Sequence, residues 1–160
     1  RDNAITSSGS YGIYLSTGLF NNNKVHGLVE SYLPPDKQEE WIEHLDEGYI
    51  LSKELNKPIF IDFTGYTCTN CRWMEINIFE EEDVKLILED FVLVKLYTDG
   101  KKEIHKKNRR LEIDRFGTAA LPYYVILSPD DKLLGTFPGM DTNKDNFINF
   151  LNNSKDKFEN

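Results

Sequence analysis

Cysteine and histidine are scarce in this sequence of 160 residues. It contains two cysteines, Cys68 and Cys71, and three histidines, His26, His44 and His105. Two cysteines cannot form the set of disulfides that stabilises a small secreted domain without a core. A structural zinc site needs four ligands, and no two of these histidines have the spacing of a ligand pair. The sequence therefore disfavours zinc, and the two thiols need another explanation.

Positive charge and long apolar runs are also limited. The chain has 19 basic and 27 acidic residues, a formal net charge of −8, which disfavours nucleic acid as a partner. No apolar run approaches the length needed to span a membrane, and no signal peptide is recognisable. Because the sequence begins with Arg1 rather than methionine, we expect it to be a piece of a longer protein.

The apolar content is nevertheless sufficient for one domain with its own core. Hydrophobic residues make up 39% of the chain and aromatic residues 12%. Residues 1–33 are rich in Ser, Gly, Asn and Tyr, and we interpret them as a linker or irregular N-terminal extension. We expect a folded domain over residues 34–153 and a polar tail over residues 154–160.

Apolar periodicity predicts the elements of this domain. Asp36 with Glu39 is typical of a helix start, and helical spacing continues from Trp41 to Leu55. Further helices are predicted after the cysteines, after an acidic run at 80–83, over a basic stretch at 103–114 and from about 143 to 151. Strands are predicted at 59–64, 91–97, 123–127 and 133–137. This order predicts an α/β fold with a mixed central sheet flanked by helices, and we interpret the basic stretch as a solvated helix face.

The two cysteines lie where the first strand meets the next helix. Cys71 follows Cys68 by one helical turn on the same face, close enough for a disulfide. The unpaired amides and the dipole at a helix N-terminus stabilise a thiolate. We therefore expect Cys68 to be the attacking nucleophile and Cys71 the resolving thiol. An inert structural disulfide and two unrelated buried thiols remain open as alternatives.

The element order, the CxxC at the first strand-helix corner and a proline entering the third strand resemble the thioredoxin fold. Residues 63–75, FTGYTCTNCRWME, look like the C-terminal thioredoxin-like domain of the DsbD family of bacterial membrane thiol-disulfide interchange proteins. This resemblance covers about residues 41–151. Residues 18–20 and 33–35 also resemble the connector that follows the last membrane helix in some of these proteins.

The resemblance implies a function and a location. It implies a reductase domain on the periplasmic side of the bacterial inner membrane, which takes electrons from a membrane donor domain of the same protein. It further implies that these electrons pass to periplasmic thiol-disulfide proteins, in routes that serve disulfide repair and cytochrome c maturation. We expect a monomer that needs no metal or organic cofactor beyond its redox-active disulfide. The alternatives are an oxidase or isomerase of the same fold and a non-catalytic thioredoxin-like binding module.

Asp62 is the one charged residue inside the otherwise apolar first strand. Burial of a lone carboxylate is costly, and it raises the pKa of the group. Asp62 precedes Cys68 by six residues, so it can lie beneath the cysteines and accept the proton of Cys71 as that thiol attacks. Its position also matches the buried aspartate of thioredoxins. The alternative is an aspartate that pairs with a lysine or is exposed at the strand end.

Glu75 lies four residues after Cys71, one turn further along the same helix face. A second carboxylate there would raise the thiol pKa values and couple its own titration to that of Asp62. DsbD-like domains have an acidic residue at the matching position. A solvated helix glutamate is the alternative.

Leu121 and Pro122 precede the third predicted strand. A proline cannot donate to a sheet, so at a strand start it marks an edge or a special turn. The resemblance implies that Pro122 is the cis-proline that packs against the CxxC, and that the Leu121 backbone pairs with a bound peptide.

Two pairs of residues depart from the thioredoxin pattern. Thr69 and Asn70 replace the Gly-Pro pair between the cysteines, a place that influences thiolate stability and redox potential. Tyr66 and Thr67 replace the tryptophan that often precedes the first cysteine, and we expect them to contact the substrate.

Overall fold

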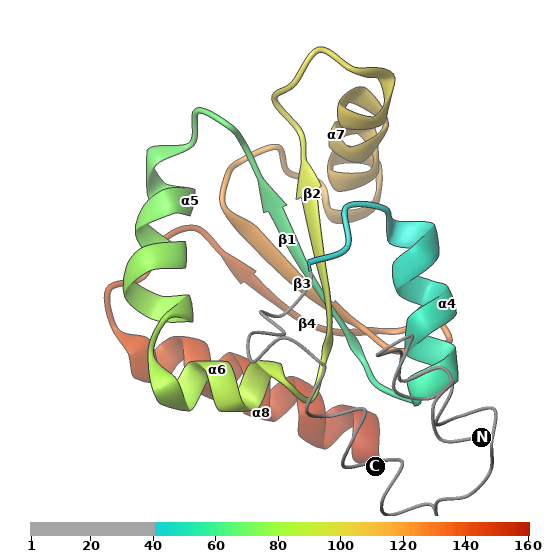
Figure 1. Cartoon of the computed structure of the whole chain (residues 1–160), viewed down its shortest axis with the longest axis vertical. Coiled ribbons are helices and arrows are strands. Elements are labelled where there is room, and N and C mark those ends of the chain that lie inside the picture. The colour runs from blue at the N-terminus through green and yellow to red at the C-terminus, as the bar shows by residue number, and fades with distance from the viewer. Residues whose placement is uncertain (1–40) are drawn as a thin grey trace, which may run out of the picture. The chain divides into compact units, whose positions relative to one another are not determined.

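A computed structural model describes residues 41–160, which fold around one four-stranded sheet (Figure 1). The expected extension over residues 1–33 and the expected helix start at Asp36 lie outside the described residues. The strands lie in the order β2-β1-β3-β4, with bounds β1 Ile59–Thr64, β2 Val92–Tyr97, β3 Tyr123–Leu127 and β4 Leu133–Pro138. All four predicted strands are therefore confirmed to within one residue.

The sheet is mixed, as the sequence predicts. Strand β1 runs parallel to β2 and antiparallel to β3, and β3 forms an antiparallel hairpin with β4. The crossover from β1 to β2 contains α5 (Thr69–Met74), the π-helix η1 (Glu75–Phe79) and α6 (Glu82–Leu88). Helix α5 continues into η1 without a break, and such π-segments often lie at functional sites.

Helices cover both faces of the sheet and divide the core into two clusters. Figure 1 shows α4 (Leu45–Leu55) and α7 (Glu103–Phe116) on one face, and α5, α6 and α8 (Lys144–Glu159) on the other. Ile59, Ile61 and Phe63 pack with α4 and α7, whereas Phe60 packs with α5, α6 and α8. Because neighbouring residues of a strand point to opposite faces, Asp62 lies on the α5 side of β1.

The first described helix begins later than the sequence predicts. Trp41 and Ile42 were expected to be helical, but Ile42 forms an isolated parallel bridge with Val94 of β2. The Ile42 amide donates to the Leu93 carbonyl at 3.0 Å, and the Ile42 carbonyl accepts from the Lys95 amide at 2.8 Å. These tertiary hydrogen bonds override a helical periodicity that is purely local.

The last helix is longer than predicted. Helix α8 continues to Glu159, so residues 154–159 are its final turns rather than a polar tail. Ser154 is buried against the sheet, and its hydroxyl donates to the Phe150 carbonyl at 2.8 Å. The polar composition of this segment therefore reflects one exposed helix face. Within the described part of the chain, no helix combines the length and apolar character needed to cross a bilayer.

Candidate redox site

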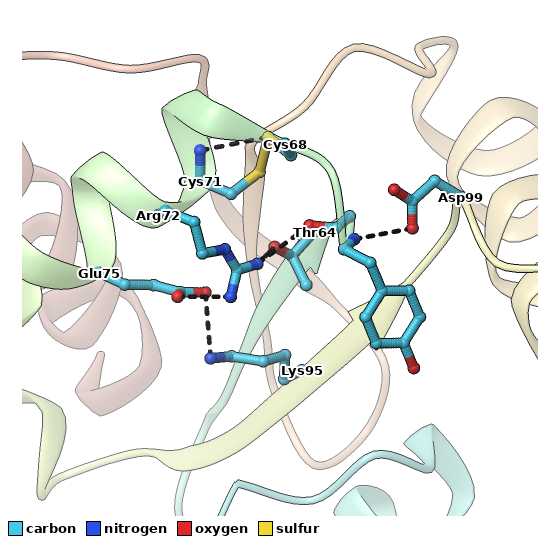
Figure 2. A network of polar contacts seen from close by, with 9 residues as sticks. Thr64, Cys68, Cys71, Arg72, Glu75, Lys95 and Asp99 are labelled. Atoms are coloured by element: carbon cyan, nitrogen blue, oxygen red, sulfur yellow. Dashed lines mark hydrogen bonds and ion pairs between the residues drawn. A yellow bond between two sulfur atoms is a disulfide. The ribbon is translucent and has the colours of Figure 1, made fainter.

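Cys68 and Cys71 form a disulfide at the N-terminus of α5, directly beyond the end of β1 (Figure 2). Their Cα atoms are 5.3 Å apart. Cys68 is the N-cap residue, and its sulfur accepts a hydrogen bond from the Cys71 amide at 3.2 Å. Cys68 is partly exposed, whereas Cys71 is only 1% exposed.

This difference in exposure assigns different chemistry to the two sulfurs. A partner can reach Cys68, where helix amides and the positive end of the dipole stabilise a thiolate. Cys71 is shielded, so it reacts only within the molecule. The arrangement is able to form a mixed disulfide at Cys68 and to resolve it from Cys71.

Asp62 lies beneath this helix and is 1% exposed. Neither of its carboxylate oxygens has a hydrogen-bond partner among the described residues. Burial raises the pKa of Asp62 to about 7; the positive charge of Lys95 opposes that rise, Glu75 adds to it, and Arg72 again opposes it. The predicted burial of Asp62 is therefore confirmed, and its raised pKa follows from that burial, whereas its proton-transfer role stays a prediction.

Glu75 does not point freely into solvent. Its carboxylate pairs with Arg72 at 2.7 Å and with Lys95 at 3.1 Å, and its side chain is 17% exposed (Figure 2). Lys95 lies opposite Asp62 in the register of β1 and β2. The structure thus brings Glu75 into the electrostatic environment of Asp62, together with two cations that partly offset both negative charges.

Arg72 and Lys95 are functional candidates that sequence reasoning missed. One Arg72 amino group donates to the Thr64 hydroxyl at 2.9 Å and to the Gly65 carbonyl at 3.0 Å. Arg72 therefore connects the end of β1 to the helix that carries Cys71. The Lys95 ammonium also lies 4.7 Å from the centre of the Trp41 ring. A lone lysine in an apolar strand was the available signal, of the same kind that identified Asp62.

Asp99 is a second residue that the sequence did not reveal. Its carboxylate accepts from the amides of Tyr66 and Thr67 at 2.8 Å and 3.0 Å, and from the Thr67 hydroxyl at 3.0 Å. Burial alone would raise the pKa of Asp99, but the hydrogen bonds from Thr67 and Tyr66 outweigh it and lower that pKa. Asp99 thereby positions the loop that precedes Cys68. In the sequence, the Asp-Gly pair indicated only a turn.

The two residues expected to contact substrate before Cys68 are both exposed. Tyr66 is 56% exposed and stacks on Tyr97, with ring centres 4.0 Å apart. Its hydroxyl lies 3.4 Å from Nε2 of the buried His105. Thr67 is exposed beside Cys68. Their position fits the expected contact with a partner, which stays a prediction.

The peptide bond between Leu121 and Pro122 is cis, as the resemblance implied. Pro122 is buried, and its carbonyl accepts from the Gly139 amide at 2.9 Å. Leu121 lies next to the redox loop, by which we mean residues 65–67 between β1 and Cys68. A Cβ atom added to Gly65 would lie 3.1 Å from the Leu121 side chain and 2.7 Å from the Asp99 carboxylate. Gly65 therefore allows three segments to meet beside the disulfide.

Within residues 41–160, no three His, Cys, Asp or Glu side chains are grouped so that they could hold a metal ion. His44 lies directly before α4, whereas His105 belongs to α7. His26 lies outside the described residues.

Comparison with known families gives a match over residues 40–129, to a family described as thioredoxin-like. Curated relatives include an uncharacterized protein of Caenorhabditis elegans, 32% identical over 92 residues, which are 57% of this chain and 13% of that protein. Human spermatogenesis-associated protein 20 is 30% identical over 89 residues, 55% of this chain and 11% of that protein. The matched region thus spans little more than a tenth of these relatives.

Solved structures confirm the thioredoxin fold. A thioredoxin from Thermus thermophilus has a TM-score of 0.64 at 20% identity, over 74% of this chain and 88% of that chain. The oxidised C-terminal domain of Neisseria meningitidis DsbD has a TM-score of 0.57 at 16% identity, over 72% and 99% of the two chains. The oxidoreductase DsbH has a TM-score of 0.56 at 19% identity, over 76% and 91%.

Proposed function

Because this chain belongs to the thioredoxin-like family, we propose that it is a thiol-disulfide oxidoreductase domain that reduces disulfides in partner proteins. The observation that carries this proposal is the Cys68-Cys71 disulfide itself, with one sulfur accessible, the other buried and a carboxyl group of raised pKa beneath the helix. An inert structural disulfide has no need of this asymmetry.

The reaction begins from the dithiol form. The Cys68 thiolate attacks one sulfur of the partner disulfide, which forms a mixed disulfide and releases the other partner sulfur as a thiolate that takes up a proton. The Cys71 sulfur then attacks Cys68, which closes the internal disulfide and releases the second partner thiol. Two electrons and two protons pass to the partner.

Asp62 is the group that accepts the proton of Cys71 in the second step. A carboxyl with a pKa of about 7 is matched to proton transfer near neutral pH. It also lies on the same side of β1 as α5, the helix that contains Cys71. Glu75, held by Arg72 and Lys95, sets the charge around it.

The proposal extends to the route of the electrons. The donor is a membrane domain and the acceptors are periplasmic thiol-disulfide proteins, with the domain on the periplasmic side of the bacterial inner membrane. The resemblance of residues 63–75 to the DsbD family supports this route, and the fold is compatible with it. Cell fractionation of the full-length protein tests the location, and a periplasm-facing CxxC domain is the expected result.

Partner trapping tests the chemistry. Cys71→Ala removes the resolving sulfur, so mixed disulfides on Cys68 should accumulate and disappear on treatment with a reductant. The double variant Cys68→Ala/Cys71→Ala is the matched control and should trap nothing. Equal trapping by the single and double variants would instead indicate a non-catalytic binding module.

The reduction potential tests the direction of transfer. A reductant should have a value close to the roughly −270 mV of thioredoxin. A value near the roughly −120 mV of a strong oxidant would contradict reductase activity and indicate an oxidase. Equilibration with glutathione or a thioredoxin of known potential gives the measurement. Stoichiometric zinc in the purified reduced protein would contradict both assignments.

A further inference from the structure

Basic residues gather in one short segment of an otherwise acidic chain. Residues 101–110 contain six lysines and arginines and one glutamate, although the whole chain has a net charge of −8. This segment forms the start of α7 and the loop that leads into it from β2. Figure 1 shows this loop at the same end of the sheet as the loop from β1 to α5, which carries Cys68.

Part of this segment lines an open hollow of about 440 Å³. Its cationic lining consists of Lys106, Arg109 and Arg110 on α7, and Asp99 and Gly100 form the wall at the end of β2. Both oxygens of Asp99 already accept hydrogen bonds from Tyr66 and Thr67, so the anion in the wall is engaged by the redox loop.

The cations of the hollow are only partly neutralised. Lys106 pairs with Glu103 at 2.6 Å. No ion pair within residues 41–160 includes Arg110, and Arg109 interacts there only with the charge of the buried Glu112. Guanidinium groups that have no carboxylate in an ion pair with them are suited to bidentate binding of carboxylates from a partner.

We propose that this hollow docks an acidic segment of the partner protein whose disulfide reacts at Cys68; the inference rests on the proposed function. Asp99 links the two places, because it lines the hollow and hydrogen-bonds Thr67, the residue before Cys68. A carboxylate-rich partner segment seated on Arg109 and Arg110 therefore brings its disulfide to the exposed sulfur. The proposal gives these exposed lysines and arginines a role in recognition, beyond the solvated face that the sequence indicates.

Charge complementarity favours an acidic polypeptide over a nucleic acid. The basic face is confined to one helix start, and the acidic remainder of the chain would repel a long polyanion. A short acidic segment needs only the hollow. Such complementarity raises the association rate and selects among partners that share the same disulfide chemistry.

Two disulfide peptides test the proposal. They have the same sequence, except that a run of glutamates in one is replaced by glutamines in the other. At low salt, kcat/KM of the reduced domain should be about three to ten times higher for the glutamate peptide than for the glutamine peptide. The advantage should vanish near 1 M salt, where the screening length falls to about 3 Å.

Charge reversal provides the matched variants. Arg109→Glu/Arg110→Glu should bring the ratio of the two rates to one or below. Lys53→Glu/Lys132→Glu makes the same change in net charge on exposed residues outside the hollow and should keep the wild-type ratio. Because charge reversal next to Glu112 can affect folding, Arg109→Gln/Arg110→Gln is the second test, with urea unfolding of each variant as the check.

The outcomes separate the two proposals. Equal rates for both peptides, or a preference that survives in the arginine variants, would overturn the docking surface and leave the exchange reaction in place. Binding of a single-stranded oligonucleotide to this face without any peptide preference would overturn it in favour of nucleic acid. Failure to reduce either peptide would overturn the proposed function itself.

Discussion

At the scale of single residues, Asp62 makes stability depend on pH. Burial raises its pKa from 3.8 to about 7, so the folded state holds a proton that the unfolded chain releases. The contribution of Asp62 to stability is therefore fully present below about pH 4, is lost as the pH rises from about 4 to 7, and changes little above that range. Asp62→Asn removes the charge, so near pH 8 it should be more stable than the wild type by up to about 4 kcal/mol.

Urea unfolding of the oxidised protein at pH 4 and pH 8 checks this prediction. The gain should shrink toward pH 4, where the wild-type carboxyl is neutral in both states. The same variant should slow the second step of exchange, because Cys71 loses its proton acceptor. Asp114→Asn, an exposed carboxylate on α7, is the control. A variant with a pH-independent stability difference would contradict the assignment.

Asp99 should act on the redox loop rather than on the global fold. Asp99→Ala removes three hydrogen bonds to Tyr66 and Thr67, at a cost of about 1 kcal/mol because the carboxylate is exposed. Cys68 would then be less well positioned, and its alkylation rate as a function of pH should change. Asp99→Asn keeps one acceptor oxygen, so its effect should be intermediate. Identical behaviour of the alanine variant and the wild type would refute this role.

At the scale of elements, helix α7 has an unusual buried stripe. His105, Asn108 and Glu112 are 7%, 5% and 0% exposed, and they face the sheet from one side of the helix. The Asn108 amide donates to the Tyr97 carbonyl at 3.0 Å. Both Glu112 oxygens have no hydrogen-bond partner among the described residues. The helix therefore buries polar groups beside the apolar Leu111 and Phe116, and the sequence, which indicated a solvated face for its lysines and arginines, did not reveal them.

Glu112→Gln should stabilise the protein above neutral pH. Burial raises the pKa of Glu112 from 4.5 to about 7, with Arg109 opposing, so the wild type loses stability as pH rises through this window. The glutamine variant avoids that loss, with a gain of at most about 3 kcal/mol at pH 8 and little near pH 4. Thermal unfolding across this range measures it, with the exposed Glu54→Gln as control. A loss of stability at pH 8 would show that the carboxylate is needed.

At the scale of the whole molecule, one aromatic residue joins the helices of one face to the sheet. Phe60 is 0% exposed, and six aromatic rings lie within 6.5 Å of its ring centre. Phe60→Ala should cost about 3–5 kcal/mol, because the truncation removes these ring contacts and leaves a cavity in the core. Ile76→Ala, at a residue 67% exposed, should change stability by less than about 0.5 kcal/mol. Urea unfolding measures both, and similar costs would contradict this account of the core.

The sequence alone was sufficient for the features that depend on local pattern. Apolar runs located all four strands, the CxxC spacing located the disulfide, and a single charge in an apolar run identified Asp62 as buried. These inferences hold because strand period, helix period and the cost of burying a carboxylate are properties of neighbouring residues.

Only the tertiary structure decided which distant groups meet. Lys95 reaches Glu75 across 20 residues, Asp99 reaches Thr67 across 32, and Ile42 leaves a helical pattern to bridge β2. Each contact depends on strand register and helix placement, which local periodicity does not encode. The cysteine pair could therefore be identified from the sequence. The charged residues that surround it, and the hollow that Lys106, Arg109 and Arg110 line, could be identified only from the tertiary structure.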